Sequence, residues 1–188
     1  MMRISLIRHG RSMLKNNEKM SLYEYNNWLT DYDNAGVLQE VSYHSETVEI
    51  VEKANIFITS DLKRSIESAL LLNANEKIIS DPLFRETGLP NAFPKIANLK
   101  LSPACWTVIL RCLWLMGYSS GCESLRDARI RAKNAAERLV NIAKEYEYVV
   151  LVGHGFFNML IAKELQKIGL KGKRRTSSQH WKVTTYTY

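Results

Sequence analysis

The 188-residue sequence predicts an α/β protein with three layers, α/β/α, in which helices cover both faces of a mostly parallel central sheet. Two observations support this fold class. Short apolar or β-branched stretches alternate with amphipathic stretches of helical spacing, and glycine closely follows two of the apolar stretches. Because the length is that of one domain, we expect a single domain over residues 1–188, with a small cap or loop region around residues 87–121.

The first elements of the chain are a strand and two helical segments. R-I-S-L-I-R at Arg3–Arg8 is a short apolar strand that ends before Gly10. Residues 15–35 are polar with interleaved aromatic rings, which indicates a helix or an ordered loop. His44–Ala54 has an apolar face at helical spacing and is expected to be helical.

The middle of the chain predicts two more strands around one helix. The strand Asn55–Thr59 precedes a helix at Asp61–Asn73, and we expect Ser60 or Asp61 to cap this helix. Lys77–Ser80 is expected to form a short third strand. Glu86–Pro103 holds three of the four prolines and is therefore expected to be a loop.

The last part of the chain predicts three helices and two strands. Trp106–Met116 is amphipathic, and Ser124–Tyr146 is the longest stretch of helical spacing. The β-branched strand Tyr148–Val152 leads into a helix that ends at about Ile168. Trp181–Tyr188 alternates and is expected to be a strand at the edge of the sheet.

Basic residues outnumber acidic ones by 26 to 19, which gives a net charge of +7. The whole excess lies in residues 123–188, because basic and acidic residues balance in residues 1–122. Such a charge favours nucleic acid, a membrane surface or an anionic small molecule as the partner. Composition alone leaves these three open.

Several classes of protein are disfavoured. No stretch approaches the roughly 18 apolar residues of a spanning helix, and the first residues lack the apolar core of a secretory signal. The three cysteines include no C-x-x-C pair, so we expect no disulfide framework, no zinc site and a cytoplasmic location. No metal-binding motif is present, and we expect neither metal nor cofactor.

Two histidines, His9 and His154, directly follow predicted strands, and glycine follows each. Because the carboxyl ends of parallel strands meet at one edge, both imidazoles are expected at the same place. Arg8 adjoins the first histidine, and Arg64 lies one turn into the helix after the second strand. Permanently charged guanidinium groups next to imidazoles suit a phosphate monoester. A neutral imidazole can attack phosphorus, while the second one stabilises the developing charge.

Five segments together resemble the histidine phosphatase superfamily, also called phosphoglycerate mutase-like, in its small phosphatase branch. They are L-I-R-H-G-R-S at 6–12, T-S-D-L-K-R-S-I-E-S-A at 59–69, D-P-L-F-R-E-T-G-L-P at 81–90, G-C-E-S at 121–124 and V-L-V-G-H-G at 150–155. The resemblance implies a phosphoglycerate mutase-like fold and a phosphohistidine intermediate.

The resemblance also implies roles for individual residues. His9 would be the nucleophile and Glu86 the proton donor, while Arg8, Arg64 and His154 would complete the phosphate pocket. Ser12 could add a hydroxyl group or cap a helix, and Gly155 could add a backbone N–H. The family often has asparagine where this chain has Lys15, so Asn16 and Asn17 are further pocket candidates. The chain also lacks the W-E-G that many relatives have after the acid.

The remaining notable residues have simpler interpretations. Four apolar residues of one helix, Trp106, Leu110, Leu113 and Trp114, are expected to pack in the core or cap. His44 and His180 follow no strand and are expected at the surface, and Cys122 is expected to fill space. Trp28 and Tyr32 could line the mouth of the pocket or hold their loop.

Metal-independent hydrolysis of a phosphomonoester is the function that these residues favour. Only about 35 residues separate Glu86 from Gly121, a small cap, whereas a mutase must shield its intermediate from water. A phosphoglycerate mutase-type phosphotransferase and a non-catalytic phosphate-binding module on the same fold are the alternatives. We expect a small phosphorylated substrate or a phosphoprotein as partner, no membrane, and no specific nucleic acid, because no nucleic-acid motif accompanies the basic residues 171–175. The oligomeric state is not readable from the sequence.

Overall fold

A computed structural model describes residues 2–72, 77–93, 96 and 98–188. The described chain forms a six-stranded sheet of order β3-β2-β4-β1-β6-β5. Neighbouring strands among β1 to β4 pair in parallel, whereas β6 pairs antiparallel with β1 and β5. The strands are β1 (Arg3–Arg8), β2 (Ile56–Thr59), β3 (Ile78–Ser80), β4 (Tyr148–Gly153), β5 (Lys171–Gly172) and β6 (Val183–Thr187). This arrangement confirms the predicted α/β fold with its mostly parallel central sheet.

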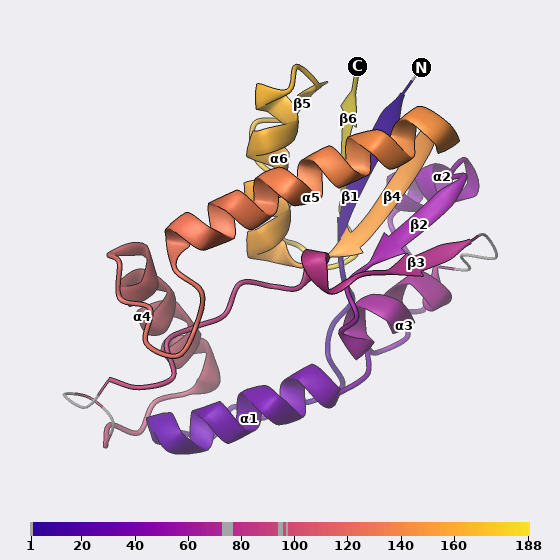
Figure 1. The fold of residues 1–188 in the computed structure, drawn as a ribbon. Coiled ribbons are helices and arrows are strands. Elements are labelled where there is room, and N and C mark those ends of the chain that lie inside the picture. Colours follow the sequence, from indigo (N-terminus) through magenta and orange to yellow (C-terminus); the bar gives the residue numbers. More distant parts are fainter. Residues whose placement is uncertain (1, 73–76, 94–95, 97) are drawn as a thin grey trace.

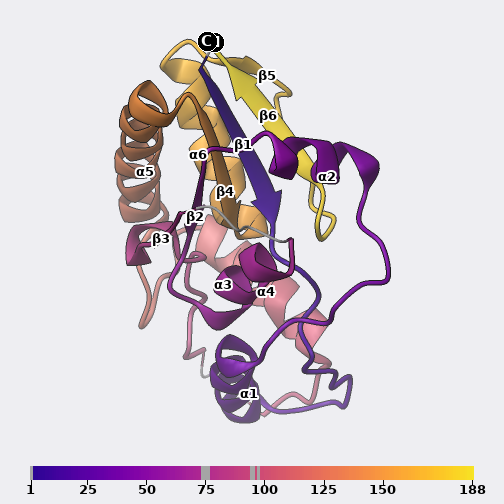
Figure 2. The ribbon, with the colours of Figure 1, turned by 90° about the vertical axis from the view of Figure 1, so that its right-hand side faces the viewer.

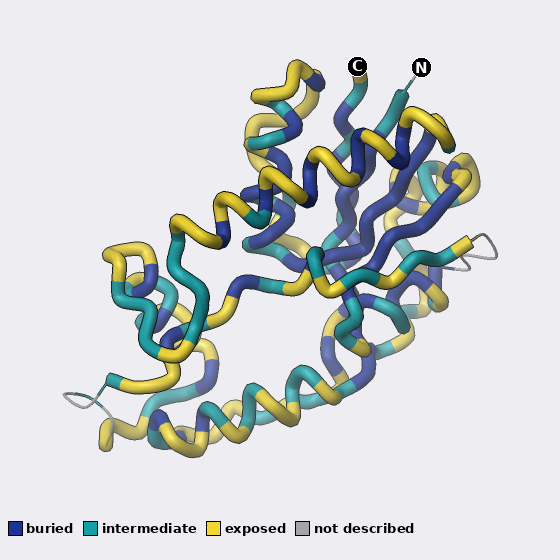
Figure 3. Tube along the Cα trace, in the orientation of Figure 1, coloured by how far each residue is buried: buried dark blue, intermediate teal, exposed yellow. Residues whose placement is uncertain are grey.

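Helices cover both faces of the sheet (Figures 1 and 2). On one face, α5 (Leu125–Tyr146) and α6 (Gly155–Lys167) pack against alternate strand residues such as Ile4 and Leu151. On the other face, α2 (Ser45–Glu52) and α3 (Lys63–Leu71) contribute to a second cluster with the strand residues that point the opposite way, among them Ile7, Phe57 and Val150. Because both faces are covered, the central strands β1, β2 and β4 are buried along almost their whole length, whereas β3 and β5 at the two edges are more exposed (Figure 3).

A smaller layer lies beyond the carboxyl ends of the parallel strands (Figure 1). It consists of α1 (Leu22–Asn34) and α4 (Pro103–Leu115), which share a separate apolar cluster with Tyr25, Trp106 and Leu110 among its buried members. Ser21 caps α1 in a capping box with Glu24, so the polar segment 15–35 resolves into a helix with an ordered lead-in. The expected packing role of the α4 residues is confirmed, since Trp106, Leu110 and Trp114 are fully buried and Leu113 packs against this cluster.

Two details of the expected elements were wrong. The N-cap of α3 is Leu62 and no side chain caps it, because Ser60 Oγ bonds a histidine instead and Asp61 pairs with Arg85. β6 is not the edge strand, since the two-residue β5 pairs beyond it. So short a strand has no periodicity to detect. The end of the predicted helix at Asn73 lies outside the described residues.

The register of the sheet determines where the site lies. Arg8 of β1 is opposite Gly153 of β4, and Thr59 of β2 is opposite Val152. The three strands therefore end at one level. The residues that follow them lie together on the side of the sheet that faces α1 and α4, which form the cap layer; these residues are His9, Ser60 and His154. Met2 and Tyr188, the two ends of the described chain, lie side by side at the opposite end of the sheet (Figures 1 and 2). None of the described helices combines the length and apolarity needed to cross a bilayer.

Candidate active site

His9 follows β1 and is held by the neighbouring strand end. Its backbone N–H donates to the carbonyl of Gly153 at 2.9 Å, and its ring Nδ1 lies 2.8 Å from the carbonyl oxygen of Gly10. A carbonyl only accepts, so Nδ1 carries the proton and the lone pair remains on Nε2. Burial lowers the pKa of His9 well below its usual range, and the charge of Arg64 lowers it further. The imidazole is therefore neutral, and its Nε2 lone pair is able to act as a nucleophile.

His154 follows β4 and occupies the N-cap position of α6. Its ring centroid lies 5.1 Å from that of His9, which confirms that the register brings the two histidines to one edge. Its Nε2 atom is 2.7 Å from Ser60 Oγ, whereas its Nδ1 atom is buried without a partner among the described residues. Burial, with the charge of Arg64 adding to it, lowers the pKa of His154 well below its usual range. When the Ser60 hydroxyl donates to Nε2, the ring proton lies on Nδ1, which can then donate to a ligand.

Two guanidinium groups complete the cluster, one on the buried Arg64 and one on the partly buried Arg8. Arg8 donates to the carbonyl of Ser178, and Arg64 Nη1 lies 2.6 Å from Asp33 Oδ1 with its guanidinium 4.9 Å from the ring centroid of Tyr32. The Nε atoms of both arginines are buried without a partner within the described chain. Because a buried unpaired donor is unfavourable, these groups mark a position suited to an anion.

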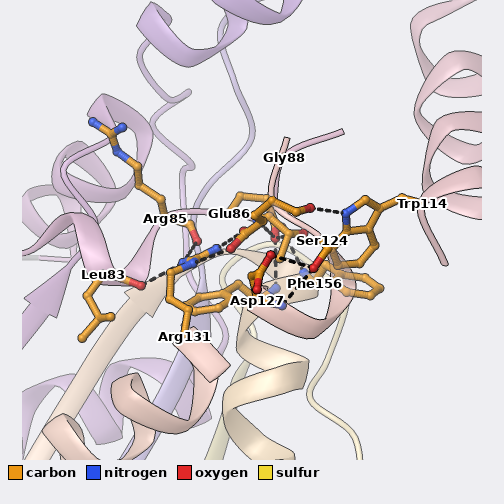
Figure 4. A network of polar contacts seen from close by, with 12 residues as sticks. Leu83, Arg85, Glu86, Gly88, Trp114, Ser124, Asp127, Arg131 and Phe156 are labelled. Carbon is orange, nitrogen blue, oxygen red and sulfur yellow. Dashed lines mark hydrogen bonds and ion pairs between the residues drawn. The ribbon is translucent and has the colours of Figure 1, made fainter. Parts of the chain in front are cut away.

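Glu86 lies against the first turn of α6, which includes Phe156 (Figure 4). Its two oxygens accept hydrogen bonds from the backbone N–H groups of Phe156 and Phe157, each at 3.0 Å, and Oε1 also accepts from Thr87 N at 2.8 Å. A helix N-terminus favours such a carboxylate because its first N–H groups have no helical partner.

Arg131 holds the loop that carries this carboxylate (Figure 4). It forms a two-pronged ion pair with Glu123 of the G-C-E-S segment, with Nε 3.0 Å from Oε2. Its Nη1 donates to the carbonyls of Leu83 and Arg85, at 2.8 and 2.9 Å. The G-C-E-S glutamate therefore has a structural role, since it orients the arginine that fixes the approach to Glu86.

A second cation, Arg111, reaches the same loop from the cap helix α4. It donates to Thr87 Oγ1 at 2.6 Å and its guanidinium lies 4.5 Å from the ring centroid of Phe156. Burial lowers the pKa of this guanidinium, and the carboxylate of Glu86 opposes that shift. Sequence reasoning did not identify Arg111, because the helix that presents it has no motif.

The hydrogen bonds of the remaining predicted pocket residues are local. Ser12 Oγ accepts from Leu14 N at 3.1 Å in a turn, and Asn16 Oδ1 accepts from Glu18 N at 2.8 Å, while Asn17 is exposed. At Gly155 a β-carbon would lie 3.3 Å from Arg8 Nε, so the missing side chain leaves space for the guanidinium. These contacts do not test the proposed phosphate contacts of Ser12 and Gly155.

His180 was expected at the surface, and this expectation was wrong. Its ring lies 5.5 Å from the ring of His9, and its Nδ1 is 2.7 Å from the His9 carbonyl oxygen. His180 precedes β6 and does not follow a strand. Because β6 runs antiparallel to β1, the start of β6 lies beside the end of β1. His44, by contrast, is exposed at the start of α2, as expected.

A cavity of about 520 Å³ opens beside this third histidine. Its walls come from the segment after β1, the segment before α2 and the segment before β6. The lining residues are Arg11, Glu40, Ser42, Tyr43, His44, Gln179, His180 and Trp181. Among the described residues, no three histidine, cysteine or acidic side chains gather as metal ligands would.

Comparisons with known proteins agree with this geometry. A family model described as histidine phosphatase superfamily (branch 1) matches residues 4–188. A phosphoglycerate mutase from Bacillus anthracis is similar in structure, with a TM-score of 0.61 at 16% identity over 98% of this chain and 86% of that one. A mycobacterial glucosyl-3-phosphoglycerate phosphatase gives 0.56 at 20% identity over 88% and 80%. No curated protein sequence matches the chain. At these identities the structural likeness shows the fold.

Proposed function

The chain belongs to branch 1 of the histidine phosphatase superfamily, and on this premise we propose that it hydrolyses phosphate monoesters through a phosphohistidine at His9. One observation carries the proposal: two buried neutral imidazoles lie 5.1 Å apart, next to the buried Arg64 and the partly buried Arg8, whose Nε atoms have no partner among the described residues. Together these groups offer a nucleophile and a set of donors for the phosphoryl oxygens, without a metal or cofactor.

In the first step, His9 Nε2 attacks phosphorus and the bond from phosphorus to the ester oxygen breaks. The departing oxygen takes a proton from a general acid. Arg8, Arg64 and the Nδ1–H of His154 donate to the equatorial oxygens, whose charge is stabilised in the transition state. In the second step, water attacks phosphorus, gives up a proton to the same group, and releases inorganic phosphate from His9.

The motif of the family suggests Glu86 as the proton donor. Its position supports a role at the edge of the site, because it bonds the first turn of the helix that begins after His154. Oε2 accepts only one backbone N–H group within the described chain, so its second lone pair could carry the proton that the reaction needs. The identity of the general acid therefore has its own test below.

The small cap favours hydrolysis over a mutase-type transfer. Two helices, α1 and α4, cover the site edge, and the similar structures include one named as a phosphatase and one named as a mutase. A small phosphorylated substrate or a phosphoprotein would be the partner. The three free cysteines support a reducing, cytoplasmic setting.

The direct test is the release of nitrophenol from p-nitrophenyl phosphate at pH 5–7 in the presence of EDTA. Wild type and His44→Ala should be active, and His9→Ala should lose activity by at least about 10³-fold, since it lacks the nucleophile. An alkaline quench of wild type with a labelled ester should recover phosphate bound to the protein. Equal activity of wild type and His9→Ala would refute the mechanism. Tight phosphate binding without turnover of any ester would indicate a binding module.

A further inference from the structure

The segment before β6 is hydrogen-bonded to Arg8 and His9, two residues of the candidate active site. Ser178 accepts a hydrogen bond from the Arg8 guanidinium through its carbonyl, and Trp181 N–H donates to the Arg8 carbonyl at 2.9 Å. Between them, His180 Nδ1 donates to the carbonyl of His9 at 2.7 Å. The imidazole of His180 is therefore positioned directly by the backbone of the nucleophile.

This hydrogen bond determines which ring atom of His180 can exchange a proton. Since the His9 carbonyl can only accept, Nδ1 must keep its proton, and Nε2 is the atom that gains or loses one. The ring lies 5.5 Å from that of His9, a separation close to the 5.1 Å between His9 and His154. His180 is thus a third imidazole at the reaction centre.

His180 differs from the other two histidines in its access to the surface. His9 and His154 are almost fully buried, whereas His180 is half-buried and lines the cavity of about 520 Å³. A cavity of this size is large enough for the organic part of a small ester. His180 therefore lies on the wall of this cavity and, through its Nδ1 bond, against the backbone of His9.

The charges around His180 suit a group that changes its protonation state. Burial lowers its pKa from the usual value and Arg8 and Arg11 lower it further, while the His9 carbonyl and Glu40 raise it. His44 also lines the cavity. The pKa of His9 and that of His154 are lowered more deeply, so those two rings stay neutral where His180 can titrate.

We propose that His180 is the general acid and base of the hydrolysis. As an imidazolium it gives the Nε2 proton to the ester oxygen while the phosphorus–oxygen bond breaks and the His9–phosphorus bond forms. As a neutral ring it then takes a proton from the water that attacks phosphorus, so the cycle ends with the imidazolium restored and inorganic phosphate released. This role rests on the proposed function, and it assigns to His180 the step that the motif assigns to Glu86.

The test compares leaving groups. Nitrophenolate departs without protonation, whereas the alkoxide of glycerol 2-phosphate needs a proton, so loss of the acid should affect only the second ester strongly. In His180→Asn, the amide can still donate to the His9 carbonyl but has no group at the Nε2 position. We expect this variant to lose about 10²–10³-fold in kcat/KM for glycerol 2-phosphate and under about tenfold for p-nitrophenyl phosphate. His44→Asn reports separately on the other histidine of the cavity.

Two more readouts separate proton transfer from positioning. The kcat/KM of wild type for glycerol 2-phosphate should fall as the pH rises past the pKa of His180, and His180→Asn should lack this decline. With p-nitrophenyl phosphate, His180→Asn should release a burst of one nitrophenol per enzyme, because water attack on phosphohistidine then limits turnover.

Four outcomes would overturn the assignment. Equal losses for both esters in His180→Asn would indicate a structural role, and no loss would exclude any role. A selective loss for glycerol 2-phosphate in Glu86→Gln, with His180→Asn active, would make Glu86 the acid. A wild-type enzyme that hydrolyses neither ester would refute the proposed function itself, and this role with it.

Discussion

The guanidinium of Arg64 is paired with the carboxylate of Asp33, whose Oδ1 lies 2.6 Å from Nη1. The arginine is almost completely buried, whereas the acid is about half exposed. Asp33 comes from the last turn of α1, in the cap layer, so the cap places a negative charge on the arginine proposed to bind phosphate. A phosphate dianion entering the site must compete with that carboxylate.

Replacing this acid should therefore strengthen phosphate binding. We expect Asp33→Asn to lower the inhibition constant of inorganic phosphate about two- to fivefold, the range that one partly exposed ion pair can supply. Competitive inhibition of p-nitrophenyl phosphate hydrolysis measures it. Asp31→Asn, an exposed acid on the same helix, should leave the constant unchanged. Weaker phosphate binding in Asp33→Asn would show that the pair orients Arg64.

The contacts of Arg131 predict a loss of stability when its planar guanidinium group is replaced by the ammonium group of lysine. Lysine keeps the charge but cannot bond Glu123 with two prongs while also donating to Leu83 and Arg85. We expect Arg131→Lys to lower the free energy of unfolding by about 2 kcal/mol, measured by urea denaturation. Arg129→Lys, an exposed residue of the same helix, should change it by less than about 0.5 kcal/mol. An unchanged stability in Arg131→Lys would mean that the network is dispensable.

The buried histidines predict how stability depends on pH. The folded-state pKa values of His9 and His154 are lowered well below 6.5, so between those values and about pH 6.5 the unfolded chain binds more protons. Stability should thus fall as the pH drops below about 6.5, by up to about 1.4 kcal/mol per pH unit for each histidine.

Urea denaturation between pH 5 and 7.5 measures this slope. His154→Gln should show a shallower slope than wild type, because one group that must be protonated on unfolding is gone. His44→Gln, at an exposed histidine, should keep the wild-type slope. A wild-type stability that stays flat or rises below pH 6.5 would contradict the lowered values.

The core of the candidate site could be predicted because its members stand in fixed relation to strand ends. His9 and His154 directly follow β1 and β4, and parallel pairing brings such positions to one level. Arg64 lies in the first turn of α3, the helix after β2, so its place follows from the same rule. Two strand ends that are each followed by a histidine and a glycine are therefore enough to predict the pair of imidazoles.

The rest of the site depends on contacts that no local pattern encodes. His180 reaches His9 only because β6 returns antiparallel beside β1, and the orientation of β6 was not predicted. Asp33 reaches Arg64 from the cap, whose position over the sheet follows from packing of α1 on α4 and not from spacing. The absence of a side-chain cap on α3 has a similar cause, since Ser60 Oγ is bonded to a histidine distant in sequence.

Two glycines that follow the two histidines predict opposite effects of the same substitution. At Gly10 a β-carbon would overlap the ring of Trp181, which is almost fully buried. Gly10→Ala should therefore push the segment before β6 outward, destabilise the fold by about 1–3 kcal/mol and separate His180 from His9. At Gly155, the first residue of α6, the nearest atom is Nε of the Arg8 side chain at 3.3 Å. Gly155→Ala should be tolerated, because that side chain can shift by the small distance required.

Thermal unfolding and glycerol 2-phosphate hydrolysis compare the two variants. We expect Gly10→Ala to lose both stability and kcat/KM, in the direction of His180→Asn, since the proton-exchanging ring moves away. Gly155→Ala should keep its stability and change only the KM, through Arg8. A Gly10→Ala variant with wild-type stability and activity would mean that the contact between Trp181 and the end of β1 does not position the third imidazole.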